Sequence, residues 1–258
     1  MNYWTQGENN IYVAAHRGFC AKYPENTMLA FEKAIELGVD QIETDVRITK
    51  DDELVLIHDA KLDRTTNGTG LVCDYTLDEL RQFDAGRGEK IPMLRELFEL
   101  VKDHPTMTLD LELKEYPIGD WEEKAFFTCD KIIEMVEEYG FADRVVINSF
   151  NQKLNEYVYT KYEGKYRQHL FFPKNVMQLD EIKLPVYSFG YCACIFADRV
   201  TKEEIEQFKR ETGIRVWAPA SVKNEETVDK YREYGIELIT CNNPDEVLNI
   251  LRAKGLHK

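Results

Sequence analysis

The sequence lacks an excess of basic residues. It has 33 lysines and arginines against 47 aspartates and glutamates, and its formal net charge is −14 at pH 7. A protein that binds nucleic-acid phosphates needs a basic face, and so does a helix that lies on an anionic membrane. We therefore expect no nucleic-acid partner, and the charge disfavours a helix bound to an anionic membrane surface. Acidity alone leaves the reaction open.

Long apolar stretches are missing too. No run approaches the roughly 20 apolar residues that a membrane-spanning helix needs. The first residues, MNYWTQGENN, have neither the basic start nor the apolar core of a signal peptide. The sequence therefore predicts a cytoplasmic protein without stable membrane insertion.

The cysteines form no recognisable framework. The six of them are scattered and lack the paired spacing of a zinc site. Thiols in a cytoplasmic protein stay reduced by default. Cys192 and Cys194 share one face if their stretch is a strand, and we interpret them as small core residues.

The chain does have the length and rhythm of a (β/α)₈ barrel. Its 258 residues, 43% of them hydrophobic, suffice for one large domain with a substantial core. Strand and helix patterns alternate about eight times, without a linker or a low-complexity segment. We therefore expect an α/β fold, a TIM-type barrel, with a single domain over residues 1–258.

Two stretches depart from this rhythm. Turn-forming residues and a short helix signal near Thr76 indicate an insertion at about residues 59–92, which we expect to form a small module over the barrel mouth. Further on, only a weak helix is predicted near residues 175–182. The strand after it lies somewhere within LPVYSFGYCACI, residues 184–195, with poorly defined limits.

Polar motifs follow or interrupt three strand-like runs near the start of the chain. His16 and Arg17 follow the run IYVAA, Glu43 and Asp45 lie within VDQIETDVRIT, and His58 follows ELVLI. The helix signal between the first two runs makes them a βαβ unit, and such a unit implies parallel strands. The ends of parallel strands meet at one edge of the sheet, so these side chains are candidates for one site.

The helix signal between those strands has clear boundaries. Asn26 or Thr27 can cap its start, an apolar stripe follows, and Gly38 ends it.

The motifs carry the residue types of an acid–base site with a metal. Glu43 and Asp45 are two residues apart in a strand, so their carboxylates point to the same side. Paired carboxylates repel unless a proton or cation lies between them, and oxygen ligands suit Mg²⁺ or Ca²⁺ better than zinc. Two nearby histidines, His16 and His58, can supply a base and an acid at neutral pH.

A later strand, TMTLDLELKEY, adds further charge. Asp110, Glu112 and Lys114 share one face of it, while leucines occupy the other. The leucine face can pack against the surrounding helices, so the charged residues on the other face would point into the barrel. Because unpaired burial of charge is costly, inward charges at a strand end indicate a site.

Structural alternatives remain for each of these residues. Glu43 and Asp45 can be a surface pair on an edge strand, and Glu112 with Lys114 a structural ion pair. A single histidine at a strand end can simply be hydrogen-bonded. Of the other histidines, His169 lies in a strand pattern and is predicted to pack, whereas exposed positions are expected for His104 and His257.

Taken together, the motifs resemble the glycerophosphodiester phosphodiesterase family. HRG, PENT, E-x-D and HD occur in the order and spacing of that family, followed by LDLELK and a weaker match at INSF, residues 147–150. The likeness is dense over residues 12–100 and weakens after about residue 150. It implies a TIM-barrel variant with a small insertion. It also implies a hydrolase of lipid and glycerol metabolism, which cleaves glycerophosphodiesters such as glycerophosphocholine to sn-glycerol 3-phosphate and an alcohol.

The resemblance also implies roles for single residues. Glu43, Asp45 and Glu112 would bind a divalent cation, Ca²⁺ or Mg²⁺. His16 and His58 would be the acid–base pair, with the assignment between them open. The resemblance further implies that the phosphate is held by Arg17 and Lys114.

The last strands depart from the family pattern. After the seventh strand the chain reads Trp217-Ala218-Pro219-Ala220, where the family often has Trp-Thr-Val-Asn. After the eighth it reads Thr240-Cys241-Asn242-Asn243-Pro244 in place of Thr-Asp-x-Pro. Trp217 remains as a candidate contact for the glycerol carbons. These changes put the specificity for glycerol and alcohol in doubt, but not the phosphate chemistry.

Three functions are therefore compared. The first is hydrolysis of small glycerophosphodiesters. The second is a lysophospholipase D activity, for which the aromatic residues of YSFGYCACIF would have to form an apolar entrance. The third is a binding protein of the same fold without turnover, which the intact histidines and carboxylates argue against. The head group, the choice between Ca²⁺ and Mg²⁺, and the oligomeric state cannot be predicted from the sequence.

Overall fold

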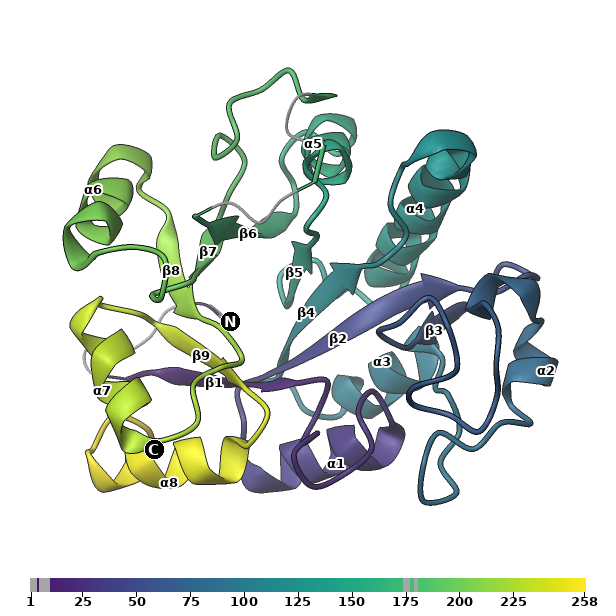
Figure 1. The fold of residues 1–258 in the computed structure, drawn as a ribbon, viewed down its shortest axis with the longest axis horizontal. Helices are drawn as coiled ribbons and strands as arrows, with labels where there is room; N and C mark the ends of the chain where they lie inside the picture. Colours follow the sequence, from purple (N-terminus) through teal and green to yellow (C-terminus); the bar gives the residue numbers. More distant parts are fainter. Residues whose placement is uncertain (1–3, 5–9, 174–176, 179–180) are drawn as a thin grey trace.

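The computed structural model describes residues 4, 10–173, 177–178 and 181–258. Eight parallel strands pair in the order β1-β9-β8-β7-β6-β5-β4-β2, and β1 also pairs with β2, so the sheet closes on itself. Helices surround the closed sheet (Figure 1). The predicted TIM-type (β/α)₈ barrel is therefore confirmed.

The elements have the following bounds. The strands are β1 Tyr12–His16, β2 Gln41–Ile48, β3 Leu54–Leu56, β4 Thr108–Leu113, β5 Val145–Asn148, β6 Arg167–Phe172, β7 Cys192–Ile195, β8 Arg215–Ala218 and β9 Leu238–Cys241. The α-helices are α1 Met28–Leu37, α2 Leu77–Leu80, α3 Leu94–Lys102, α4 Glu122–Glu138, α5 Gln152–Lys161, α6 Lys202–Thr212, α7 Glu225–Glu233 and α8 Pro244–Ala253. Among the residues that the structure describes, the short 3₁₀ helices are η1 Val72–Asp74 and η2 Gly119–Trp121.

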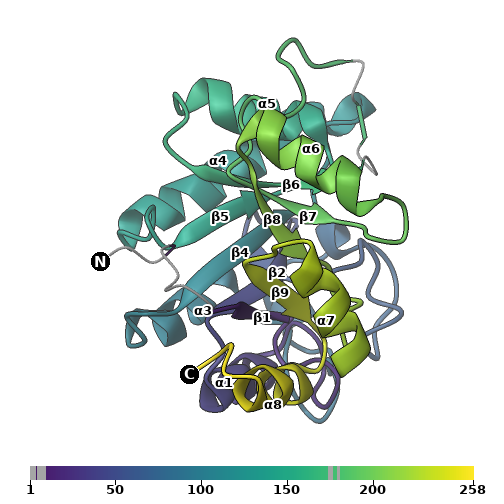
Figure 2. The ribbon, with the colours of Figure 1, turned by 90° about the vertical axis from the view of Figure 1, so that its left-hand side faces the viewer.

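Local sequence signals set several helix ends. Thr27 is the N-cap of α1 and accepts a hydrogen bond from the Ala30 backbone N–H, and Gly38 ends that helix at φ 82° in the left-handed region. Thr76 caps α2 in a reciprocal pair with Glu79, as the short helix signal in the sequence predicts. Figure 2 shows α1 and α8 side by side at the bottom of the view. They lie outside the barrel, near the place where the first strand β1 pairs with the last strand β9.

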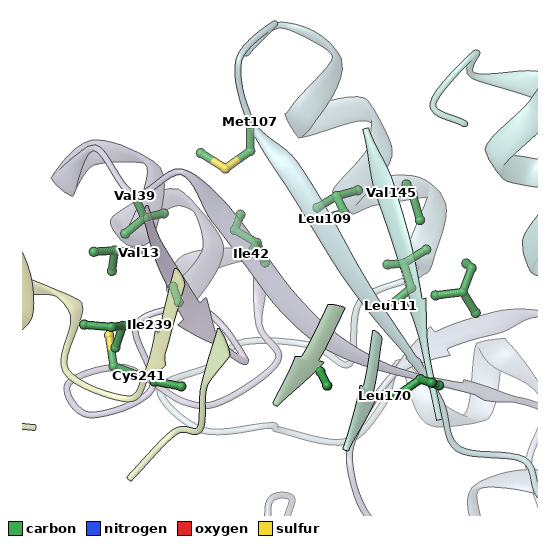
Figure 3. Close-up of a cluster of buried hydrophobic side chains, with 14 of the residues drawn as sticks. Val13, Val39, Ile42, Met107, Leu109, Leu111, Val145, Leu170, Ile239 and Cys241 are labelled. Atoms are coloured by element: carbon green, nitrogen blue, oxygen red, sulfur yellow. The ribbon is translucent and has the colours of Figure 1, made fainter. Parts of the chain in front are cut away.

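The main hydrophobic core lies between the strands and the helices. Alternate residues of each strand point outward, and Figure 3 shows Val13, Ile42, Leu109 and Ile239 among the side chains in this layer. The apolar stripe of α3, which includes Phe98, packs onto it from outside. Because this layer takes the apolar residues of each strand, the polar residues of β1, β2 and β4 must point into the barrel.

The barrel interior is divided along its axis. Its lower part is an apolar floor of six buried side chains: Trp4, Ala14, Val146, Cys192, Trp217 and Leu238. Trp4 stacks on Trp217 with 6.2 Å between ring centroids. Above this floor, toward the carboxyl ends of the strands, the interior carries charged and polar residues.

The insertion lies between β2 and α3 and begins earlier than residue 59. The segment ELVLI forms the short strand β3, which turns back and pairs antiparallel with β2, with Leu56 opposite Val46. It is therefore part of the excursion and not a strand of the barrel. The segment has its own apolar cluster, made of Val55, Ile57, Leu62, Val72, Leu80, Ala85 and Ile91.

The connection from β6 to β7 differs from the others. Half of the weak helix predicted near residues 175–182 lies outside the described residues, and residues 177–178 and 181–182 are not α-helical. Within LPVYSFGYCACI only Cys192–Ile195 are a strand, and the residues before it form turns. Among the described helices, none combines the length and the apolar character that a membrane crossing requires.

Candidate active site

The ends of β1 and β2 place the first histidine beside the first carboxylate. His16 pairs in register with Glu43, and its Nε2 lies 3.8 Å from Glu43 Oε2. The Arg17 backbone N–H donates to the same oxygen over 3.0 Å. The sharp turn that follows depends on Gly18, because its φ is 75° and a Cβ there would lie 2.7 Å from the carbonyl carbon of Ala30.

Strands β2 and β4 bring three buried carboxylates together. Asp45 pairs in register with Glu112, and one oxygen from each of Glu43, Asp45 and Glu112 lies within 4.8 Å of the other two. Burial, with Asp45 and Glu112 nearby, raises the pKa of Glu43 well above its usual value. Burial also raises the pKa of Glu112 to about 7, although Lys114 opposes this shift. Such a cluster needs a shared proton or cation, and its all-oxygen donors fit Ca²⁺ or Mg²⁺.

Asp45 is the most firmly held of the three. Asn26 Nδ2 donates to its Oδ2 over 2.8 Å, and Thr44 Oγ1 in turn donates to Asn26 Oδ1 over 2.7 Å. Lys114 Nζ and Arg17 Nε lie 3.1 and 3.2 Å from its two oxygens. Burial alone would raise the pKa of Asp45, but Lys114 and Arg17 together lower it. The carboxylate is therefore held in its charged form.

Lys114 extends this charge network along β4. Its Nζ donates to Glu112 Oε1 over 2.5 Å, and its side chain is only 6% exposed. The ion pair considered as the structural alternative for these two residues is thus present. An ammonium group this close to the carboxylates also reduces the repulsion that a bound phosphate would meet.

The second histidine comes from the insertion. His58 follows β3, and its Nδ1 lies 2.5 Å from Asp59 Oδ1. Arg64 donates to Asp59 and also to Glu25, which accepts a further hydrogen bond from Arg17. Arg64, despite burial, lowers the pKa of Asp59 far below its usual range. This chain of four charged side chains connects His58 on the insertion to Arg17 on the barrel.

The two histidines have different partners. His16 Nδ1 lies 2.5 Å from Asn242 Oδ1, a neutral amide after β9, whereas the partner of His58 is a carboxylate. Burial, with Arg17 beside the ring, lowers the pKa of His16 to about 4. Burial also lowers the pKa of His58, with Asp45 opposing the shift. Burial therefore favours the neutral form of both rings.

These groups surround one cavity of about 250 Å³ at the carboxyl ends of the strands. Its charged wall contains six of the predicted residues: His16, Arg17, Glu43, His58, Glu112 and Lys114. The opposite wall is apolar, with the residues Phe150, Phe171, Phe196, Pro219 and Ala220. Phe150 and Phe171 are stacked, with 3.9 Å between ring centroids.

Two predicted residues lie behind this lining. Asp45 is completely buried beneath the charged wall, within reach of the lining oxygens of Glu43 and Glu112. Trp217 lies in the apolar floor, 2% exposed, with its ring edge against His169. The alternative that Glu43 and Asp45 form a surface pair on an edge strand is wrong, because β2 lies between β1 and β4 in the barrel.

Several site residues were not predicted from the sequence. Asn26 was considered only as a helix cap, although it lies within the PENT motif and holds Asp45. Asn242 lies 226 positions from its partner His16, and it was noted only as part of the departure from the family pattern after the eighth strand. Asn148 lines the cavity as well.

The other histidines also differ from expectation. His169 does pack, against Trp217, but it also lines the cavity and lies 2.6 Å from Asp110. The exposed position expected for His257 is wrong. Its side chain is 7% exposed and bonded to Asp40, because the chain after α8 folds back against the connection between α1 and β2.

The chain is similar to known proteins over nearly its whole length. A profile of the Glycerophosphoryl diester phosphodiesterase family matches residues 16–246. A glycerophosphodiester phosphodiesterase of Caldanaerobacter subterraneus subsp. tengcongensis is 34% identical over 254 residues, which cover 94% of this chain and 98% of that protein. A glycerophosphodiester phosphodiesterase of Bacillus altitudinis is also 34% identical, over 92% of this chain and 97% of its own.

Solved structures are similar to the whole barrel. A glycerophosphodiester phosphodiesterase from Thermotoga maritima matches with a TM-score of 0.73 at 25% identity, over 93% of this chain and 98% of that one. A phosphodiesterase from Oleispira antarctica, in complex with the product sn-glycerol-3-phosphate, matches with a TM-score of 0.80 at 24% identity, over 93% and 96% of the two chains. These likenesses support the fold assignment.

Proposed function

Because the chain belongs to the glycerophosphodiester phosphodiesterase family, we propose that it hydrolyses glycerophosphodiesters to sn-glycerol 3-phosphate and an alcohol. The observation that carries this proposal is the meeting of two histidines, three carboxylates and two cationic side chains at one cavity. The cavity volume of about 250 Å³ favours a small phosphodiester over a bulky one.

We propose that Glu43, Asp45 and Glu112 hold a divalent cation, Ca²⁺ or Mg²⁺. When bound, such an ion supplies positive charge that polarises a phosphoryl oxygen and stabilises developing negative charge. The raised pKa values of Glu43 and Glu112 support this assignment, because a cation would replace the protons that the cluster otherwise shares. The choice between the two ions remains open.

Arg17 and Lys114 are the proposed phosphate ligands. Both line the cavity and both already contact Asp45, so their charged groups face the same carboxylate from two sides. A phosphodiester carries one negative charge, and more accumulates during attack on the phosphorus. Fixed cationic groups that face this charge lower the barrier.

The histidines would move the protons. One removes the proton from the attacking hydroxyl, of water or of the glycerol 2-position, and the other donates a proton to the departing alkoxide oxygen. If the glycerol 2-hydroxyl attacks, the first product is a cyclic phosphate, and water opens this ring in a second step to give sn-glycerol 3-phosphate. The carboxylate of Asp59 stabilises a protonated His58, while burial and the nearby Arg17 favour a neutral His16. We therefore propose His16 as the base and His58 as the acid.

The direct test is product formation from a panel of glycerophosphodiesters, with and without EDTA. We expect sn-glycerol 3-phosphate to appear and EDTA to stop its formation, with recovery when Ca²⁺ or Mg²⁺ is added back. Undiminished turnover in excess EDTA would contradict the metal assignment. No turnover on any diester would support the alternative of a binding protein without activity.

One observation favours lysophospholipase D activity as a second candidate. The apolar wall with Phe150, Phe171 and Phe196 could accept part of an acyl chain. The same panel should therefore include lysophosphatidylcholine. Faster release of choline from that lipid than from glycerophosphocholine would make the lipid the preferred substrate. A cytoplasmic location and the absence of a nucleic-acid partner stay predictions.

A further inference from the structure

The cavity contains a histidine–aspartate pair that the proposed chemistry does not use. His169 lies on β6. Asp110 lies on β4, two residues before Glu112 and therefore deeper in the barrel on the same face of the strand. His169 Nδ1 lies 2.6 Å from Asp110 Oδ2, and the two side chains are 5% and 0% exposed. Both residues line the cavity. Charged pairs buried this deeply are costly in free energy unless other groups complete their hydrogen bonds.

Several polar atoms here lack a partner. His169 Nε2, Asn148 Oδ1 and Asp110 Oδ1 are buried, and none finds a hydrogen-bond partner among the described residues. The carboxylate fixes the ring tautomer, because Nδ1–H donates to Asp110 and leaves Nε2 as an acceptor. Glu112 on β4 is paired in register with Asn148 on β5, and Asn148 is paired with His169 on β6. The unpartnered atoms therefore lie beside the carboxylate cluster on the barrel wall. A part of the substrate next to the phosphate would contact them.

The chemistry of these atoms selects a hydroxyl group. Nε2 as an acceptor takes a hydrogen bond, and the amide of Asn148 can donate or accept one, so a hydroxyl satisfies both. A trimethylammonium group can donate no hydrogen bond. The neighbourhood is also closed from below, since the ring of His169 lies against Trp217 in the apolar floor. The closed end of the cavity can accept only a group of fixed size, so we expect the invariant part of the substrate to bind there.

We propose that His169, oriented by Asp110, and Asn148 bind the terminal hydroxyl of the glycerol moiety, and that this contact makes the enzyme specific for glycerol esters. The inference rests on the proposed function and names the residues that would recognise the glycerol part of the substrate. Glycerol is common to all the diesters in question, whereas the alcohol differs from one to the next. The alcohol then extends along the apolar wall of Phe150, Phe171 and Phe196. His169 is a binding residue in this scheme, and Asp110 is a positioning residue.

The test compares two substrates that differ in one hydroxyl. One is glycerophosphocholine, and the other is the choline phosphodiester of propane-1,2-diol, which keeps the 2-hydroxyl but lacks the terminal one. We expect wild type to have a kcat/KM for the glycerol ester about three- to tenfold higher, the value of one hydrogen bond. In His169→Asn the new amide can still donate to Asp110 but cannot reach the place of Nε2. The ratio of the two kcat/KM values should therefore fall to about one.

Two variants keep the test decisive. His169→Gln can place an amide group near the position of Nε2 and should retain part of the preference, even if His169→Asn does not fold. His257→Asn is the matched control, because His257 also pairs with an aspartate, Asp40, but lies outside the cavity lining. Its ratio should equal that of wild type.

The outcomes separate the two proposals. Hydrolysis of both esters at equal efficiency by wild type, or an unchanged ratio in folded His169→Asn, would overturn the glycerol assignment alone. Failure of wild type to hydrolyse either ester would overturn the proposed function itself. Inhibition by sn-glycerol 3-phosphate that weakens in His169→Asn, but not in His257→Asn, would support the same contact at equilibrium.

Discussion

The cavity has two unlike walls. β1, β2 and β4, with the insertion, contribute charged side chains that hold one another through short contacts such as Lys114 to Glu112 at 2.5 Å. β5 to β9 and the segments after them contribute mostly aromatic and small residues. Buried charges need partners at fixed positions, whereas apolar contacts tolerate changes of shape. The comparison indicates that the charged wall carries the chemistry common to all substrates, and that the apolar wall determines which alcohol is accepted.

The strongest test of the charged wall is the removal of one metal ligand. Glu43→Gln keeps the size of the side chain but removes a donor charge, so metal affinity and turnover should fall together for every diester. Titration calorimetry measures the first and product formation the second. Glu36→Gln on the exposed face of α1 is the control. Unchanged metal binding in folded Glu43→Gln would contradict the proposed cluster.

The next effect concerns the histidines. General acid or base groups typically contribute on the order of 10²–10⁴-fold each, so His16→Ala and His58→Ala should each lower kcat by about that factor. The double variant should be less impaired than the product of the two singles, because the groups act in one step. Near-normal rates in both single variants on a natural diester would mean that the histidines are structural. His104→Ala, outside the cavity lining, is the control.

A substrate with a better leaving group then distinguishes the two histidines. A p-nitrophenyl diester needs no proton on its departing oxygen, so it should restore the rate only in the variant that lacks the acid. We expect rescue in His58→Ala and none in His16→Ala. The reverse pattern would exchange the two roles without affecting the rest of the proposal.

Changes in the apolar wall should have smaller and selective effects. Phe171→Leu removes part of the stacked pair with Phe150, and its effect on kcat/KM should differ among diesters by about tenfold, since shape changes in an apolar pocket are worth roughly 1–3 kcal/mol. The measurement is a panel of choline, ethanolamine and inositol esters. Phe127→Leu, on the exposed side of α4, is the control. A uniform loss over the panel would show that the two walls are not functionally distinct.

The smallest effect is on stability, and it depends on pH. The folded pKa of Glu112 is about 7, above the ordinary value of 4.5 that applies to the unfolded chain. Ionisation is therefore easier in the unfolded chain, and the carboxyl destabilises the metal-free fold as the pH rises from 4.5 through 7. Glu112→Gln should thus stabilise metal-free protein by about 1–3 kcal/mol at pH 8, and this gain should vanish near pH 4.5.

Denaturant unfolding in EDTA measures that difference, with wild type at each pH as the reference. Saturating Ca²⁺ should reverse its sign, because the variant has lost a metal ligand. A gain that does not depend on pH would mean that Glu112 is not the group responsible.

The two walls also differ in how far the sequence predicts them. A strand period of two correctly brought Glu43 and Asp45 to one face and Glu112 and Lys114 to another, since these residues are neighbours along the chain. The same period does not predict how deep along the barrel axis a side chain lies. Trp217 was therefore expected to contact the substrate, whereas it lies in the apolar floor. The pairing of His169 with Asp110 spans 59 positions and depends on the order of the strands, which no local pattern contains.

The insertion shows the same limit. Its turn-rich composition was recognisable, but β3 has the pattern of an ordinary strand. Only its antiparallel pairing with β2 assigns it to the excursion. Local patterns therefore predict that a strand exists more readily than they predict its partner.

The separate apolar cluster of the insertion has a consequence for how the enzyme loses activity. His58 belongs to this small unit, while Glu43, Asp45 and Glu112 stand on barrel strands. Small units with few buried contacts open more often than the domain that carries them. A molecule in which only residues 49–93 have opened would keep the three proposed cation ligands and lack His58, the proposed proton donor. Under mild heating or limited proteolysis, catalysis should then fail before cation binding does.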